Sequence, residues 1–243
     1  MEILSEGAKE LGIRLTPLQL DQFETYFAEL ADWNQRMNLT SVVEYEEVQI
    51  KHFLDSLTVV LAFPGGLGGL ESVIDVGAGP GFPGLPLKLI YPDLTLALVE
   101  SVGKKTDFLK HLVSTLGLSG VEVHTGRAER LAHQPELREA FDLVVTRALA
   151  RLPVLAEYTL PFCVTGGVMV ALKHGGIDAE LAGAAHALEA LGGQMRKVMP
   201  VEVTGLTDNR ILVAVDKIGS TPERFPRRPG IPAKRPVECV CGS

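Results

Sequence analysis

The residues best suited to chemistry form a glycine-dense turn, Asp75-Val-Gly-Ala-Gly-Pro-Gly-Phe-Pro-Gly84. The turn directly follows a short apolar run and precedes a helical pattern near Pro83–Ile90. Such a turn lets a ligand approach the backbone and points the amides of a helix N-terminus at it. We therefore predict a nucleoside-cofactor site at this strand-to-helix junction.

Two cofactors are compatible with the turn. Gly79-x-Gly81-x-x-Gly84 satisfies the dinucleotide fingerprint, but Pro83 and Pro86 lack amides that a pyrophosphate would use. Asp75, two residues before the first glycine, resembles the opening motif of methyltransferases that use S-adenosyl-L-methionine (AdoMet), a ligand without phosphate. Glu100 ends the next apolar run, where a carboxylate could bind the ribose of either cofactor.

Motifs of several other enzyme classes are missing from the sequence. No G-x-S-x-G, H-E-x-x-H or G-x-x-x-x-G-K-[ST] pattern occurs, which argues against the usual hydrolases and nucleotide triphosphatases. Thr146-Arg147-Ala148 stands where exocyclic-amine methyltransferases have an Asn/Asp-Pro-Pro-aromatic motif, and no Pro-Cys pair suggests methylation of pyrimidine C5. The histidines lack ligand spacing and the cysteines form no C-x-x-C pair, so we expect no metal site.

From residue 72 onward, short aliphatic runs alternate with longer amphipathic stretches, which is typical of β-α-β units. Arg196–Val203 and Ile211–Lys217 leave no room for a helix between them, so we expect an antiparallel hairpin at one edge. The predicted fold is α/β, a doubly wound Rossmann-like methyltransferase sheet. Its other strands are predicted at Val73–Val76, Leu94–Val99, Val121–His124, Phe141–Val145 and Val168–Leu172, and its helices at Pro83–Ile90, Lys104–Leu116, Leu152–Pro161 and Ala179–Leu191.

Residues 1–70 form a predicted helical region ahead of the sheet. Thr16-Pro17 is a helix start signal, and the following apolar stripe comprises Phe23, Phe27, Leu30, Trp33 and Met37. A second helix is predicted from about Glu44 to Ala62, with Val48, Phe53, Leu57 and Leu61 on its buried side. The glycine-rich stretch 64–69 then suggests a boundary. The expected division is 1–70, a methyltransferase domain at 71–218, and a basic Pro/Arg-rich tail at 219–243.

The composition is that of a folded soluble protein. The 243 residues are 46% hydrophobic and 22% charged, which excludes disordered and fibrous classes. The sequence has no apolar stretch of about 18 residues and no signal peptide, so we expect no membrane partner. Cys163, Cys239 and Cys241 form no disulfide framework, which fits a cytoplasmic location. The net charge of −7 argues against non-specific coating of nucleic acid but permits a local basic surface.

Several motifs in a consistent order resemble the glucose-inhibited division B family, the bacterial 16S ribosomal RNA guanine-N7 methyltransferases. The resemblance runs from about Phe23 to Val237, and His174 departs from it where the family usually has glycine after Lys173. Cys239–Ser243 has no family counterpart. The motifs are Trp33-Asn34, Asn38-Leu39-Thr40, His52-x-x-Asp55-Ser56-Leu57, the turn from Asp75 to Gly84, Arg147-Ala148, Leu172-Lys173, and Phe225-Pro226-Arg227 with Gly230-Ile-Pro232.

The resemblance implies AdoMet-dependent methylation of N7 of a guanine in the 530 loop, nucleotide 527 in conventional rRNA numbering. It implies 16S rRNA as the partner, within the 30S subunit or its precursor, and we expect the enzyme to be a monomer. Arg147, Asn38 and Arg227 are the candidates for the reacting guanine. Together with the turn analysis, the resemblance predicts cofactor contacts from Asp75, Gly77, Gly79, Phe82, Glu100, Ser101, Val102, Ala128, Glu129 and Arg147.

An RNA-facing surface is predicted mainly from the tail. Residues 219–236 carry five Lys or Arg residues against Glu223 alone, a local charge of +4, and prolines stiffen the segment. A solvated terminus is the alternative for the tail, helix capping the alternative for Asn38, and solvated surface the alternative for Lys104 and Arg127. The predicted RNA contacts are His52, Lys104, Arg127, Lys173, Arg227, Arg228, Lys234 and Arg235.

Two other functions compete with methyl transfer. An NAD-dependent oxidoreductase would use the glycine turn but would leave the basic tail unexplained. A non-catalytic, AdoMet-sensing ribosome-assembly factor would keep the tail and could lose the cofactor turn, whose acidic residues and glycines are all present. Guanine N7 has a lone pair and no proton, so its methylation needs positioning rather than a general base. We therefore expect a site without an acid–base pair.

Overall fold

The computed structural model describes residues 1–147 and 150–237. Ala148 of the predicted Arg147-Ala148 motif and the terminal Cys239–Ser243 lie outside the described residues.

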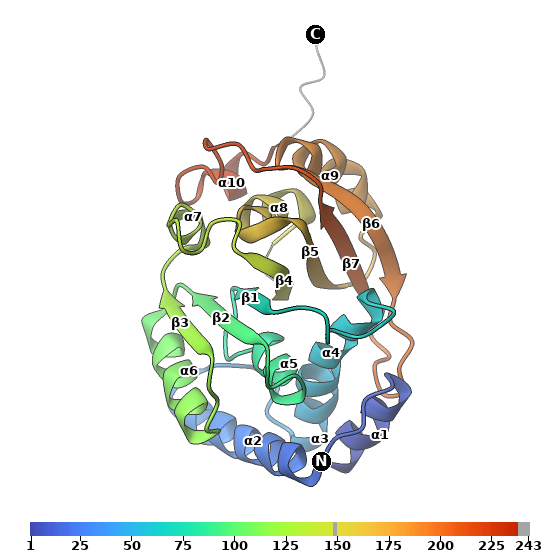
Figure 1. Ribbon diagram of the computed structural model, residues 1–243. Coiled ribbons are helices and arrows are strands. Elements are labelled where there is room, and N and C mark those ends of the chain that lie inside the picture. The colour runs from blue at the N-terminus through green and yellow to red at the C-terminus, as the bar shows by residue number, and fades with distance from the viewer. Residues whose placement is uncertain (148–149, 238–243) are drawn as a thin grey trace.

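Seven strands form one mixed sheet in the order β3-β2-β1-β4-β5-β7-β6 (Figure 1). The first five are parallel to one another, and β7 pairs antiparallel with both β5 and β6. The predicted doubly wound fold with an antiparallel edge is therefore confirmed, and the later strand of the hairpin is the one that joins β5. The strands are β1 Ser72–Val76, β2 Thr95–Glu100, β3 Val121–Thr125, β4 Phe141–Arg147, β5 Cys163–His174, β6 Gly193–Pro200 and β7 Arg210–Lys217.

Helices cover both faces of the sheet (Figure 1). Alternate residues of each strand face opposite layers, so Val73 joins one buried cluster and Ile74 the other. The first cluster includes α1 Glu2–Glu10, α2 Pro17–Met37, α5 Gly84–Ile90 and α6 Gly103–Thr115. The second includes α7 Ala128–Leu131, α8 Leu152–Thr159 and α9 Asp178–Ala190. The N-terminal helices thus share one core with the sheet.

The N-terminal helices follow the sequence pattern with one change. Thr16 caps α2 through a reciprocal capping box with Gln19, as its start signal predicted. The second predicted helix is a continuous helical run but not a uniform α-helix: it comprises α3 Tyr45–Val48, the π-helical η1 Gln49–Leu54, α4 Asp55–Leu57 and the 3-10 turn η2 Thr58–Ala62. The predicted burial of Leu61 is wrong, since it is 39% exposed on the tightened last turn.

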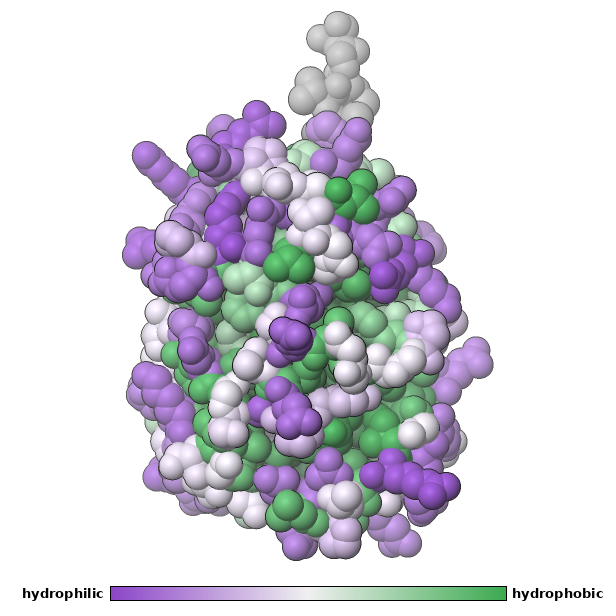
Figure 2. Space-filling view, viewed as in Figure 1, coloured by the Kyte–Doolittle hydropathy of each residue, from purple (hydrophilic) through white to green (hydrophobic). Residues whose placement is uncertain are grey.

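The C-terminal segment, residues 219–237, packs on α7 and α8. The Phe225 ring is buried, and the Arg138 guanidinium donates hydrogen bonds to the carbonyls of Thr221 and Phe225. The segment contains the short helix α10 Ile231–Lys234. Figure 2 shows hydrophilic side chains gathered at this end of the molecule. Among the helices of the described residues, none has both the length and the apolar character needed to span a bilayer.

Candidate functional site

A cavity of about 300 Å³ lies at the carboxyl ends of strands β1 to β4. Ligands of open α/β sheets bind in this position. The sheet order places the loop after β3 at one end of the cavity, with β2, β1 and β4 following in turn. The cavity is lined by Val76, Gly77, Gly79, Val99, Glu100, Ser101, Lys105, Gly126, Arg127, Ala128, Glu129, Arg147 and Tyr158.

The glycine turn forms one wall of this cavity. The amides of Gly77 and Ala78 both donate to the Val99 carbonyl, at 2.9 and 3.0 Å, which fastens the turn to β2. Gly79 has a left-handed φ of +57°, and a Cβ placed there would have no protein atom closer than the Gly77 carbonyl oxygen at 4.0 Å. A ligand can therefore approach the backbone at Gly79.

Three of the predicted cofactor residues, Asp75, Phe82 and Val102, are not among the cavity-lining residues. The Asp75 carboxylate is fully buried behind the turn, where its Oδ2 accepts a hydrogen bond of 2.8 Å from the Gly84 amide. Burial raises the pKa of Asp75 to about 7, against the opposing effects of that amide and of Arg147. The Asp75 carboxylate thus links the end of β1 to Gly84 across the turn. Its contact with a cofactor stays a prediction.

Glu100 projects from the end of β2 into the cavity. Its Oε2 accepts from the Gly79 amide at 3.0 Å, and its Oε1 accepts from the Val102 amide at 2.8 Å and the Ser101 hydroxyl at 3.3 Å. The carboxylate is therefore held in one orientation, and its remaining lone pairs can accept from hydroxyl groups of a ligand. Ser101 lines the cavity, whereas Val102 begins the turn into α6 with a half-exposed side chain.

The loop after β3 supplies the far end of the cavity. The buried Glu129 carboxylate accepts a hydrogen bond from Arg127 at 3.0 Å and from the Gly230 amide at 3.1 Å. Burial favours the neutral acid, but these donors outweigh it and lower the pKa of Glu129. Arg127, predicted as an RNA contact, thus lines the cofactor cavity in an ion pair. Lys105, which the sequence did not single out, also lines the cavity, and the RNA contact predicted for Lys104 stays a prediction.

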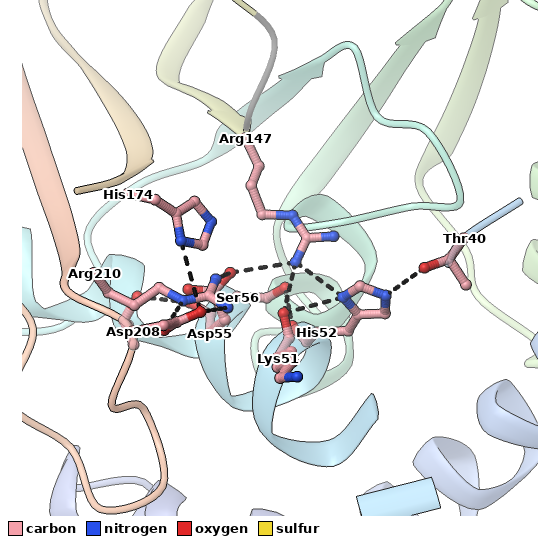
Figure 3. Close-up of polar contacts among 10 residues, drawn as sticks. Thr40, Lys51, His52, Asp55, Ser56, Arg147, His174, Asp208 and Arg210 are labelled. Atoms are coloured by element: carbon pink, nitrogen blue, oxygen red, sulfur yellow. Dashed lines mark hydrogen bonds and ion pairs between the residues drawn. The ribbon is translucent and has the colours of Figure 1, made fainter. Parts of the chain in front are cut away.

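Arg147 closes the cavity at the end of β4 and reaches the N-terminal helical run (Figure 3). Its Nη1 lies 3.0 Å from the Lys51 carbonyl oxygen, 3.2 Å from His52 Nδ1 and 3.2 Å from Asp55 Oδ2. The π-helical turn shapes this contact, because the Asp55 amide donates to the carbonyls of Ile50 and His52. The Lys51 carbonyl oxygen accepts from Arg147 Nη1.

His52 contacts the Arg147 guanidinium from the N-terminal helical run. Burial and the neighbouring Arg147 cation lower the pKa of His52 to about 3, so its imidazole is neutral. Nδ1 lies 3.2 Å from Arg147 Nη1 and 3.0 Å from the Lys51 carbonyl oxygen, and Nε2 lies 2.8 Å from the Thr40 hydroxyl. The imidazole stacks on the Phe82 ring at 4.6 Å, and the Arg147 guanidinium lies 4.9 Å from the same ring. Both ring nitrogens of the predicted RNA contact His52 are engaged within the protein.

The other predicted residues lie outside this cavity. Asn38 is the left-handed C-cap residue of α2, with an exposed side chain, and its contact with the guanine stays a prediction. Lys173 lies 2.8 Å from both the Ala150 carbonyl and the Glu180 carboxylate. Arg227 donates hydrogen bonds to the buried Glu157 carboxylate from its backbone amide, its Nε and its Nη2.

Comparison with known proteins decides the family. A family model described as "GidB: rRNA small subunit methyltransferase G" matches residues 19–208. The chain belongs to the GidB family. It is an rRNA small subunit methyltransferase of the AdoMet-dependent type, which confirms the predicted enzyme class and cofactor.

Similar proteins match the chain along nearly all its length. The ribosomal RNA small subunit methyltransferase G of Dehalococcoides mccartyi is 51% identical, with 98% of this chain and 100% of that protein covered. The enzyme of the same description from Moorella thermoacetica is 48% identical, with 97% and 98% covered.

Solved structures support the fold alone. A variant of MtNAS in complex with S-adenosylmethionine aligns with a TM-score of 0.52 at 18% identity, covering 89% of this chain and 77% of that one. A ribosomal protein L11 methylase from Lactobacillus delbrueckii subsp. bulgaricus aligns with a TM-score of 0.50 at 15% identity, covering 70% and 79%.

The cavity residues fit the AdoMet donor of the family. Open space beside Gly79 allows a ligand to lie against the backbone, and the fixed Glu100 carboxylate has lone pairs for the two hydroxyls of a ribose. Tyr158, also missed from the sequence, adds an aromatic wall from α8.

We expect Gly79→Val to abolish AdoMet binding while the fold is retained. A β-branched residue is disfavoured at φ +57°, and its side chain would enter the space beside the turn. Calorimetric titration measures the binding, and circular dichroism checks the fold. Gly68→Val is the matched control, since a Cβ there also meets open space but outside the cavity. Parental affinity in Gly79→Val would contradict the cofactor assignment.

We expect Glu100→Ala to weaken AdoMet binding by roughly ten- to a hundredfold, because charge-assisted hydrogen bonds contribute about 1.5–3 kcal/mol. The same change releases the amides of Gly79 and Val102, which adds to the loss. Titration of the variant against the exposed control Glu122→Ala isolates the effect. Equal affinities of the two variants would show that Glu100 does not contact the ligand.

We expect the buried His52 to make the parent protein less stable as the pH is lowered. The unfolded chain takes up a proton near pH 6.5, whereas the folded imidazole stays neutral to about 3. The stabilisation is therefore present above pH 6.5 and is lost as the pH falls towards 3. Between pH 7 and 5 the free energy of unfolding should drop by about 1–2 kcal/mol more in the parent than in His52→Gln. Parallel denaturation curves for the two proteins would argue against a neutral, buried His52.

Proposed function

We propose that the enzyme transfers a methyl group from AdoMet to N7 of guanine 527, in the 530 loop of 16S rRNA. The observation that carries the proposal is the chemistry at the β4 end of the cavity. The groups there are a guanidinium paired with a carboxylate and a neutral imidazole whose nitrogens are both engaged. Neither is placed to remove a proton, and N7 of guanine has none to lose.

Methyl transfer to N7 balances without acid or base catalysis. AdoMet supplies an electrophilic methyl group, whose bond to sulfur breaks with its electron pair left on sulfur as the N7 lone pair forms the new bond. The positive charge moves from sulfur to the purine. The task of the protein is to align the two reactants, which can contribute most of the rate enhancement.

A basic groove beside the cavity supports an RNA substrate. It lies between α7 and the C-terminal segment and shares Glu129 with the cofactor cavity. Because Arg127 and the Gly230 amide already engage that carboxylate, the groove presents mainly positive charge. Its lining residues are Glu129, Arg130, His133, Arg224, Pro226, Arg227, Arg228 and Pro229. We place the phosphates flanking the target nucleotide here; Lys234 and Arg235 are exposed but do not line the groove.

The substrate assignment is tested by incubating 30S subunits, and separately naked 16S rRNA, with the enzyme and isotope-labelled AdoMet. Mass mapping should locate one added methyl group at N7 of nucleotide 527. Methylation at another nucleotide or another atom would refute the proposed position. Binding of 30S particles without any methyl transfer would instead support the assembly-factor alternative, while the family assignment already argues against an NAD-dependent oxidoreductase.

We expect the triple change Arg130→Gln, Arg224→Gln and Arg228→Gln to weaken rRNA binding and leave AdoMet binding intact. Each lost phosphate contact should lower the slope of log affinity against log salt by about 0.7–0.9. Arg227 is left unchanged, because its removal would strand the buried Glu157 carboxylate.

The control for this prediction is the triple change Lys9→Gln, Arg14→Gln and Lys197→Gln, which removes equal charge from surfaces outside the groove. Filter binding at several salt concentrations measures both variants. An identical salt slope for the two would remove the groove from the RNA interface.

A further inference from the structure

The Arg147 guanidinium has two edges with different surroundings. Nη1 is engaged by the Lys51 carbonyl, His52 and Asp55. Nε and Nη2 have no hydrogen-bond acceptor within the part of the chain that the structure describes. The side chain is 13% exposed and lines the cavity. One edge is thus held by protein, and the other offers N–H donors to a ligand.

The orientation of this second edge is constrained from several sides. The guanidinium lies over the Phe82 ring, which itself stacks on Tyr26 and His52. The Tyr26 hydroxyl is anchored on the Pro80 carbonyl at 2.7 Å. A guanidinium gripped at one nitrogen and supported on one face keeps its remaining donors in a fixed plane.

The cluster around Arg147 carries balanced charge. Asp55 is buried and pairs with both Arg147 and Arg210, and Arg210 also pairs with Asp208 (Figure 3). With His52 neutral, two cations face two carboxylates. This balance matters because the methylated purine is itself cationic, and an uncompensated guanidinium beside it would oppose the reaction.

The sheet order places Arg147 at the reacting end of the cavity. β4 lies beside β1, two strands away from β2 and three from β3, whose following loop carries Glu129. If the nucleoside part of AdoMet lies against Glu100 and Glu129, the transferable methyl group would lie towards β1 and β4. This step rests on the proposed function.

We propose that the free edge of Arg147 donates a hydrogen bond to O6 of the target guanine and thereby selects guanine over adenine. O6 and N7 are adjacent acceptors on one edge of guanine. N7 must stay bare to attack the methyl group, so O6 is the acceptor left for a neighbouring guanidinium. Adenine carries an amino group at this position, and that donor would face the donors of Arg147.

The test varies the enzyme and the base together. Target RNA is prepared with guanosine, inosine or 2-aminopurine at the methylated position; inosine keeps O6 and 2-aminopurine lacks it. Methylation rates at saturating AdoMet are measured for the parent, Arg147→Met, Arg147→Lys and the exposed control Arg14→Met. We expect the parent to prefer the O6-bearing bases over 2-aminopurine ten- to a hundredfold more strongly than Arg147→Met does.

The intrinsic reactivities of the bases appear equally in every enzyme and cancel from the comparison. Arg147→Lys keeps a cation beside Asp55 and should also lose the preference, which provides the test if Arg147→Met fails to fold. If the Arg147 variants keep the parental preference between bases, the proposal is overturned. This holds also if the variants lose AdoMet affinity, since Arg147 would then bind the cofactor and not select the base. Absence of N7 methylation by the parent on guanosine RNA would refute the proposed function itself.

Discussion

The buried Asp55 carboxylate links the parts of the molecule that surround the β4 end of the cavity. It lies on the N-terminal helical run and pairs with Arg147 from β4 and Arg210 from β7. Removing one partner of such a buried group is costly because the others are left uncompensated in a region of low dielectric. The π-helical turn contributes to this arrangement, since His52, Asp55 and the Lys51 carbonyl all contact one guanidinium.

The acidic residues Asp75 and Glu100 shape the glycine turn. Asp75 braces the turn through the Gly84 amide, and Glu100 fixes both Gly79 and the start of α6. Glycine is needed at 84 because a Cβ there would lie 2.9 Å from the Asp75 side chain. The turn is therefore shaped before any ligand arrives, which reduces the ordering that binding requires.

The C-terminal segment combines packing with charge display. Arg138 and Arg227 are used to attach it to the body of the protein, while Arg224 and Arg228 remain exposed along the groove. An enzyme with a net charge of −7 can thus present a local basic surface next to its cofactor cavity. Of five basic residues that look equivalent in the sequence, Arg227 alone is held in an ion pair by the described residues.

The sequence by itself determined the fold class, the strand runs to within a few residues at most ends, the edge hairpin and the glycine turn, because periodicity and turn chemistry are local properties. Tertiary structure decided the pairing of Arg147 with Asp55, 92 residues away, and of Arg227 with Glu157, 70 residues away. It also decided that Lys105 rather than Lys104 lines the cavity, which depends on the phase of α6 against the sheet. Whether a charged side chain is free or engaged depends on neighbours that no local pattern brings together.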